Sequence, residues 1–167
     1  MAGTVVRNFM KQQGFVEEPE DACDMHFQGL YFQPRIVFTL VLVGILLQNG
    51  VFFLVLSAIL WWNVLVPRFN PFEVAYNTWI AARRGTLTLA PAPGPRRFAQ
   101  GMAAAMVLGT GLALLGGAPL VAWVLEGFLV VAFSALLFGR FCLGAYVYHL
   151  LKGRVAFANS TLPWARG

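Results

Sequence analysis

Residues 36–66 read IVFTLVLVGILLQNGVFFLVLSAILWWNVLV, and this stretch decides the fold because it contains no charged residue. A bilayer core is about 30 Å thick, so a helix needs roughly 20 residues to cross it. The stretch is therefore longer than one crossing requires and shorter than two full crossings require. It predicts either a hairpin that turns at Gln48, Asn49 and Gly50 or a single long, tilted helix.

A second apolar block runs from Phe98 to about Leu151 and is interrupted by GGAP at residues 116–119. The Lys and Arg residues decide between the two interpretations, because cytoplasmic segments of membrane proteins carry an excess of them. None lies in or beside QNG or GGAP, and four crossings put every one of them on one side of the membrane. The twelve are Arg7, Lys11, Arg35, Arg68, Arg83, Arg84, Arg96, Arg97, Arg140, Lys152, Arg154 and Arg166.

We therefore predict an all-α integral membrane protein with four transmembrane helices arranged as two hairpins. The spans are expected at about 34–48, 50–66, 98–116 and 119–140, within a four-helix membrane domain at 34–152. The arm 1–33 and the tail 153–167 are expected in the cytoplasm, and the protein in a bacterial inner membrane.

The composition agrees with lipid as the main solvent. Hydrophobic residues make up 59% of the chain and charged residues only 11%, against about 25% charged residues in soluble domains. The net charge of +5 follows from the bias toward positive cytoplasmic segments. We therefore expect the lipid bilayer and other membrane subunits as partners, and no nucleic acid.

The loop between the two hairpins predicts a short helix over 71–84. Asn70, Pro71 and Glu73 suit its N-cap, first and third positions. A short helix with an aromatic face and terminal arginines is expected to lie in the cytoplasmic headgroup layer; binding of a partner is the functional alternative. The residues concerned are Phe72, Tyr76, Trp79, Arg83 and Arg84. The Pro-rich segment that follows, TLTLAPAPGP, is expected to be an extended linker that is mobile unless something binds it.

Three segments occur in the same order as in a family that we recognise. They are the Pro71–Phe72 segment, PRRFAQG at 95–101 and FCLGAYVY at 141–148. The chain resembles a family of small bacterial membrane proteins that is catalogued only as a domain of unknown function, over roughly residues 34 to 152. The resemblance implies the four-span layout and supplies no established activity.

In that family the last motif usually reads Cys-Leu-Gly-Cys, and some relatives look fused to sulfur-transfer domains. A Cys-x-x-Cys pair at a helix end can cycle between dithiol and disulfide. This chain has Ala145 in place of the second cysteine, so the dithiol is lost. We expect Cys142 to be an inert apolar residue, with lipidation or single-thiol reactivity as the alternatives.

Two further sets of side chains are candidates for chemistry. Cys23 and His26 are two soft metal ligands, but zinc needs three or four, so no metal site is predicted; a composite site with Cys142 and His149 is the weak alternative. Glu126 is the single acid inside a predicted span, and it is expected either at the outer interface or in a proton or ion pathway. Arg140, at the end of the same span, is expected to reach the inner interface.

The sequence therefore predicts a non-catalytic accessory subunit of a larger membrane complex, for instance an electron-transfer or photosynthetic one. The aromatic residues of the N-terminal arm favour docking on another protein. No cofactor is predicted, although lipids or pigments between the helices remain open. The alternatives are a thiol or sulfur-handling membrane protein that uses Cys142 and a small transporter that uses Glu126.

The small residues Gly101, Ala105 and Gly109 recur four apart in the third span. Such a face lets helices approach closely in lipid. We read it as the packing face of that helix and attach no function to it.

Overall fold

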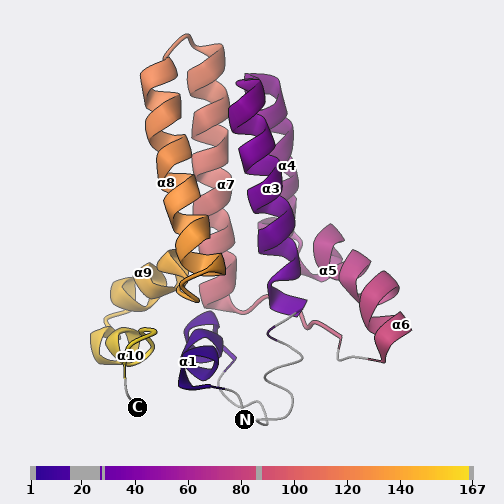
Figure 1. Cartoon of the computed structure of the whole chain (residues 1–167), viewed down its shortest axis with the longest axis vertical. Helices are drawn as coiled ribbons and strands as arrows, with labels where there is room; N and C mark the ends of the chain where they lie inside the picture. The colour runs from indigo at the N-terminus through magenta and orange to yellow at the C-terminus, as the bar shows by residue number, and fades with distance from the viewer. Residues whose placement is uncertain (1–2, 16–26, 28, 86–87, 166–167) are drawn as a thin grey trace.

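The computed structural model describes the chain except residues 1–2, 16–26, 28, 86–87 and 166–167. Every regular element in the described part is a helix. Four long helices form an elongated bundle, and shorter helices gather at one end of it, which we call the base (Figure 1). The long helices are α3 (Phe32–Leu47), α4 (Gly50–Leu65), α7 (Gly94–Leu115) and α8 (Pro119–Leu137).

The first apolar block is a helical hairpin and not one long helix. Gln48 ends α3 with a left-handed backbone at φ 46°. Asn49 then caps α4, because its side-chain oxygen accepts a hydrogen bond from the Phe52 N–H at 3.1 Å. The second hairpin turns at GGAP, where Gly117 has a φ of 70° and Pro119 occupies the first turn of α8.

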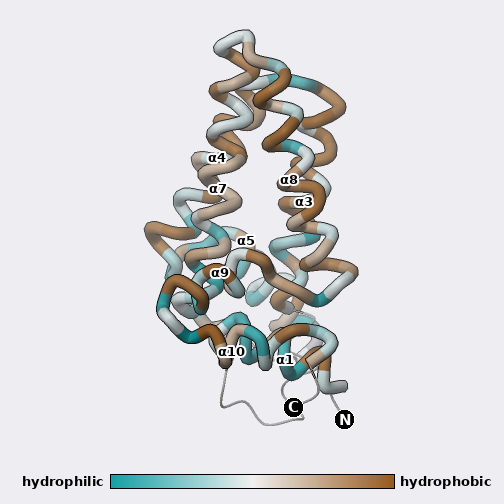
Figure 2. The backbone as a smooth tube through the Cα atoms, turned by 90° about the vertical axis from the view of Figure 1, so that its left-hand side faces the viewer, coloured by the Kyte–Doolittle hydropathy of each residue, from teal (hydrophilic) through white to brown (hydrophobic). Residues whose placement is uncertain are grey.

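Helices α7 and α8 are long and apolar enough to cross a membrane, whereas α3 and α4 are apolar but shorter, with 16 residues each. At a rise of about 1.5 Å per residue, the second hairpin therefore extends beyond the first at the end opposite the base (Figure 1). In Figure 2 the hairpins are largely hydrophobic, and many of the hydrophilic residues gather at the base.

The closest helix pair is α4 and α7. A Cβ atom added to Gly50 would lie 2.8 Å from the Gly111 carbonyl oxygen, so the contact requires glycine. About two helical turns closer to the base, the Ser57 hydroxyl donates to the Ala104 carbonyl at 3.0 Å. The small face predicted from Gly101, Ala105 and Gly109 is a packing face only in part. Ala105 is exposed, whereas a Cβ atom on Gly109 would lie 3.1 Å from Leu125 of α8. The close contact with α4 runs along Ala104 and Gly111.

The described part of the N-terminal arm packs beneath the bundle. Helix α1 (Thr4–Gln13) lies beside α9 (Leu143–Leu151) and near α10 (Val155–Ser160) at the base (Figure 1). Phe9 and Met10 are almost fully buried there, and the Phe9 ring contacts Phe27 and Tyr31 at centroid distances of 5.6 and 5.4 Å. The aromatic residues that favoured docking on another protein are therefore used within the chain.

The helix predicted at 71–84 is present, with Asn70 as its N-cap; its side-chain oxygen accepts from the Phe72 N–H at 3.0 Å. It consists of α5 (Pro71–Ala75), a π-helical segment η2 (Tyr76–Ala81) and α6 (Ala82–Arg84). The wider π turn changes the angular spacing of side chains, so the predicted aromatic face is divided. Tyr76 is 6% exposed and Trp79 is 67% exposed.

The linker after this helix is also held in part. The Leu89 N–H donates to the Asn77 side-chain oxygen at 2.8 Å, and the Asn77 amide donates back to the Leu89 carbonyl at 3.1 Å. Leu89 is buried in the base. At this position the chain itself binds the linker, because one side chain satisfies both backbone groups of Leu89.

Candidate functional site

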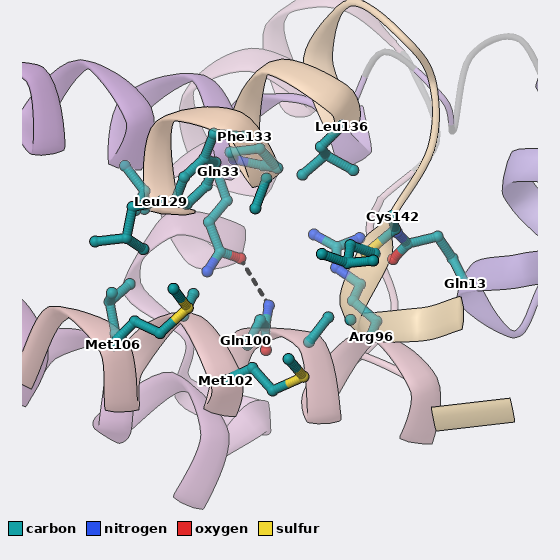
Figure 3. Close-up of a pocket in the computed structure, with 18 of the residues that line it drawn as sticks. Gln13, Gln33, Arg96, Gln100, Met102, Met106, Leu129, Phe133, Leu136 and Cys142 are labelled. Atoms are coloured by element: carbon teal, nitrogen blue, oxygen red, sulfur yellow. Dashed lines mark hydrogen bonds between the residues drawn. The ribbon is translucent and has the colours of Figure 1, made fainter. Parts of the chain in front are cut away.

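A cavity of about 260 Å³ lies where the bundle meets the base. Its walls come from α3, α7 and α8, and the start of α9 and the end of α1 close the side where Cys142 and Gln13 lie, at the right in Figure 3. Side chains of two kinds line it. Gln13, Gln33, Arg96, Gln100 and Cys142 are polar, and Val37, Met106, Leu129 and Phe133 are among the apolar residues.

The segments by which the sequence resembles its family meet at this cavity. Gly144 of the Cys-Leu-Gly motif packs directly on Ala99 of the Phe-Ala-Gln motif, since a Cβ atom added to Gly144 would lie 2.6 Å from the Ala99 Cα. Ala99, Gln100, Cys142 and Gly144 all line the cavity. The two motifs are therefore two halves of one packing contact between α7 and α9.

The third segment reaches the same place through an ion pair. Glu73, two residues after Pro71, lies 3.7 Å from the guanidinium of Arg96, and both side chains are buried. Burial raises the pKa of the Glu73 carboxyl, while Arg96 and the Asn70 side chain oppose that rise. Glu73 was predicted as a capping residue of its helix; the fold turns it toward α7 instead.

An amide network connects the ion pair to the bundle. The Gln33 side-chain oxygen accepts from the Asn70 amide at 3.2 Å and from the Gln100 amide at 3.0 Å. This joins the start of α3, the cap of α5 and the last residue of the Phe-Ala-Gln motif. The Gln100 side-chain oxygen is buried and has no hydrogen-bond partner among the described residues.

Cys142 immediately precedes α9 and is 6% exposed. Its backbone N–H donates to the Gln12 side-chain oxygen at 2.9 Å, which fixes α1 beneath the motif. Burial raises the pKa of the Cys142 thiol, and the Ala145 N–H, the Gln13 side chain and Arg96 oppose that rise without cancelling it. The thiol is therefore held in its neutral form, in which it is a poor nucleophile.

His149 lies on the other side of Gln12. Its Nε2 is 3.1 Å from the Gln12 carbonyl oxygen, and its ring packs against Phe157 at a centroid distance of 4.7 Å. Cys23 and His26 lie outside the described residues. The composite metal site is therefore represented by Cys142 and His149 alone, and each of these makes a hydrogen bond to Gln12.

Glu126 does not line this cavity; it lies one helical turn beyond Leu129, on the side toward the turn of the first hairpin. The Gln48 amide donates to both of its carboxylate oxygens at 3.1 Å, and the Trp123 ring N–H donates to the Gln48 side-chain oxygen at 3.3 Å. Glu126 is 4% exposed. It therefore links α8 to the turn between α3 and α4.

Arg140 follows the base end of α8, fourteen residues after Glu126, and the two do not pair. It follows the end of the helix in a left-handed conformation at φ 52°. Its guanidinium sits 5.4 Å from the centroid of the Phe27 ring, and its side chain is exposed. The contact that the structure describes for the Arg140 side chain is therefore with Phe27, a residue of the base.

Sequence reasoning missed most of the polar residues of the cavity. Gln33 and Gln100 were not candidates, although each is an amide at the base end of an apolar block, and that position was the available signal. Arg96 was read only as one of many cytoplasmic cations. Its role depends on Glu73, which is 23 residues earlier in the chain, and no local pattern marks that pairing.

The fold and the site define a class: a helical protein with apolar hairpins and, at one end of them, a cavity lined by both polar and apolar side chains. The chain belongs to the family described as Domain of unknown function (DUF4395), which matches residues 28–153. No match was found among curated proteins or among solved structures.

Proposed function

We propose that the chain is a four-span integral membrane protein, inserted as two hairpins, and that it is a non-catalytic accessory subunit of a larger membrane assembly. The observation that carries the proposal is the apolar exterior of all four long helices. Leu46 on α3, Val55 on α4, Leu112 on α7 and Phe128 on α8 are each more than half exposed. Contiguous apolar surface of this kind is suited to lipid or to other membrane subunits.

The sidedness of the proposal rests on charge. No Lys or Arg occurs between Arg35 and Arg68 or between Arg97 and Arg140, so both hairpins lack cations. The described cations belong to the base and to the segments that join it, which is the cytoplasmic side by the positive-inside rule. The shorter first hairpin is accommodated by local thinning of the bilayer, which leaves Glu126 near the outer interface.

The helix at 71–84 supports an interfacial location for the base. Three large apolar side chains in and just before this helix are about half exposed or more: Phe69, Val74 and Trp79. Tyr76 of the same helix is buried, so the exposed side chains form a separate outer surface. Exposed aromatic side chains beside Arg83 are suited to the headgroup layer or to a partner at the same depth.

The non-catalytic part of the proposal rests on the state of the titratable groups. Glu73 and Arg96 are paired with each other, and the Cys142 thiol is buried with a raised pKa. These features favour a subunit that is held together by polar contacts over the sulfur-handling alternative. For the transporter alternative, Glu126 has one amide partner and no chain of further ionisable groups in the described part of α8.

Two experiments test the proposal. Tags placed at the N-terminus and in the linker at 88–93 are expected to be accessible from the same, cytoplasmic side; accessibility from opposite sides would overturn the four-span arrangement. Extraction in a mild detergent, followed by mass spectrometry, is expected to recover the chain in a stable complex with other membrane proteins. Recovery of the chain alone, at the mass of the protein and its detergent, would overturn the subunit role.

Two variants test the alternatives. Cys142→Ser is expected to leave sulfur-dependent growth unchanged, and a loss of that growth would favour thiol chemistry. Glu126→Gln is expected to leave ion flux in liposomes at the background level of empty liposomes. Flux in the wild type that disappears in this variant would favour the transporter.

A further inference from the structure

We infer that the cavity at the base binds one acyl chain with an anionic oxygen headgroup, the head lying at Arg96 and the chain running between α3, α7 and α8. The inference rests on the proposed membrane location, since lipid supplies such molecules. It names a ligand class for a site that the subunit role alone does not require.

The headgroup end contains a buried cation whose charged partner lies beyond hydrogen-bond distance. Arg96 carries five N–H donors, and its single charged partner among the described residues, Glu73, is 3.7 Å away, beyond hydrogen-bond distance. The Gln33 side-chain oxygen already accepts from two amides, and the Gln100 side-chain oxygen is a buried acceptor that a protonated headgroup could also use. A guanidinium beside a cavity favours a carboxylate or phosphate oxygen.

The ion pair also allows a second negative charge to enter. Burial already raises the pKa of the Glu73 carboxyl, so an anion that binds Arg96 is accommodated when Glu73 takes up a proton. Arg96 is almost fully buried, and a buried cation that shares one distant anion gains from a closer one.

The other end of the cavity is suited to a hydrocarbon chain. Val37, Met106, Leu129 and Phe133 line it (Figure 3), and flexible methionine side chains adapt to an irregular apolar ligand. From Arg96 to Met106 the wall follows α7 for ten residues, which is about 15 Å at 1.5 Å per residue. Water is a poor occupant of that end, because an apolar cavity offers it no partners. The cavity therefore has a polar end toward the base and an apolar end toward the hairpins, which matches the orientation of an amphiphile in the proposed membrane.

Native mass spectrometry of the purified full chain in a neutral detergent tests the inference, with palmitate and hexadecanol as probes. The two have the same chain length and differ in headgroup charge. We expect one palmitate per protein, retained about tenfold more strongly than hexadecanol, since only the palmitate carboxylate can form a charge-assisted hydrogen bond with Arg96. Equal retention of the two probes would overturn the headgroup assignment.

A matched pair of variants on α7 tests the location. Ala103 lines the cavity and Ala105 is exposed on the outer side of the same helix. Ala103→Phe is expected to fill the cavity and lower palmitate retention about tenfold, while Ala105→Phe retains it. Both variants must keep the thermal midpoint of the wild type within a few degrees. Equal retention by the two would mean that palmitate only coats the lipid-facing surface, which would overturn the inference.

A neutral double variant tests the charge without leaving one partner buried alone. Glu73→Gln combined with Arg96→Gln is expected to retain palmitate and hexadecanol equally; a preserved palmitate preference would overturn the role of Arg96. Phosphatidylglycerol and phosphatidylcholine, added in the same way, distinguish the sources of the anionic chain. Selective retention of phosphatidylglycerol assigns a phospholipid, and retention of palmitate alone assigns a free fatty acid. None of these outcomes bears on co-purification with other subunits, so the two proposals fail separately.

Discussion

The molecule buries two carboxylates, one at each end of the bundle, and they differ in how they are held. Glu73 lies at the base against the Arg96 guanidinium, where three separate segments of the chain meet. Glu126 lies near the turn of the first hairpin, where the Gln48 amide donates to both of its oxygens. One carboxylate belongs to a charged network, and the other to a single neutral contact.

The two carboxylates also differ in how easily they are noticed in the sequence. Glu126 stands out because apolar residues surround it in the sequence, whereas Glu73 looks like an ordinary residue of a helix start. In the folded chain Glu73 has the more demanding environment, since its partner is a buried cation. Isolation in the sequence is therefore a poor guide to how strongly a buried charge is coupled to the fold.

The largest effect is expected from removal of the cation at the base. Arg96→Met leaves Glu73 buried without its partner, and breaking a buried pair in this way costs about 3–5 kcal/mol of unfolding free energy. The loss would appear as a lower thermal midpoint of the detergent-purified protein. Adding Glu73→Gln to the same chain is expected to restore much of the stability, because no unpaired charge remains. A double variant as unstable as the single one would contradict the pairing.

A smaller loss is expected where the two motifs touch. Gly144→Ala places a methyl group 2.6 Å from Ala99, and overpacking of this kind costs about 1–3 kcal/mol. Gly127→Ala is the matched control, since a Cβ atom there meets nothing within 4 Å. The control is expected to be as stable as the wild type or more so by up to about 1 kcal/mol, because alanine favours helix. Chemical or thermal denaturation of the two variants side by side measures the difference.

The pH dependence of stability distinguishes Glu73 further. Because its pKa in the folded protein is raised above the ordinary value, the folded state binds more protons than the unfolded state between the two values. Unfolding free energy is therefore expected to fall as pH rises through that window and to be highest below it. In Glu73→Gln this contribution to the slope disappears, and an unchanged slope would contradict the assignment.

The smallest effect is expected at the far end. Glu126→Gln keeps an oxygen that can accept from the Gln48 amide, so the change in unfolding free energy is expected to be no more than about 1 kcal/mol, the size of one neutral hydrogen bond. The thermal midpoint checks this directly. A loss as large as that of Arg96→Met would remove the distinction between the two ends.

Much of the local structure could be predicted from the sequence. The breaks at Gln48–Gly50 and at GGAP, the Asn70 cap and the four long helices follow from residue chemistry within a few positions. The packing faces could not be predicted in the same way. The stripe at Gly101, Ala105 and Gly109 and the close contact at Gly111 both consist of small residues, and only the position of α4 distinguishes them.

The sequence by itself determined where helices begin and end, which stretches are apolar, and that the cations lie outside the two hairpins. These features depend on neighbouring residues and on the transfer of side chains from water. Tertiary structure decided what the polar residues do. Gln12 and Cys142 are 130 residues apart and share a hydrogen bond, and Gly144 meets Ala99 only because α9 turns back beneath α7. Pairings of this kind depend on how the helices are placed. The pattern of apolar and polar residues along one helix does not identify the element against which that helix will pack.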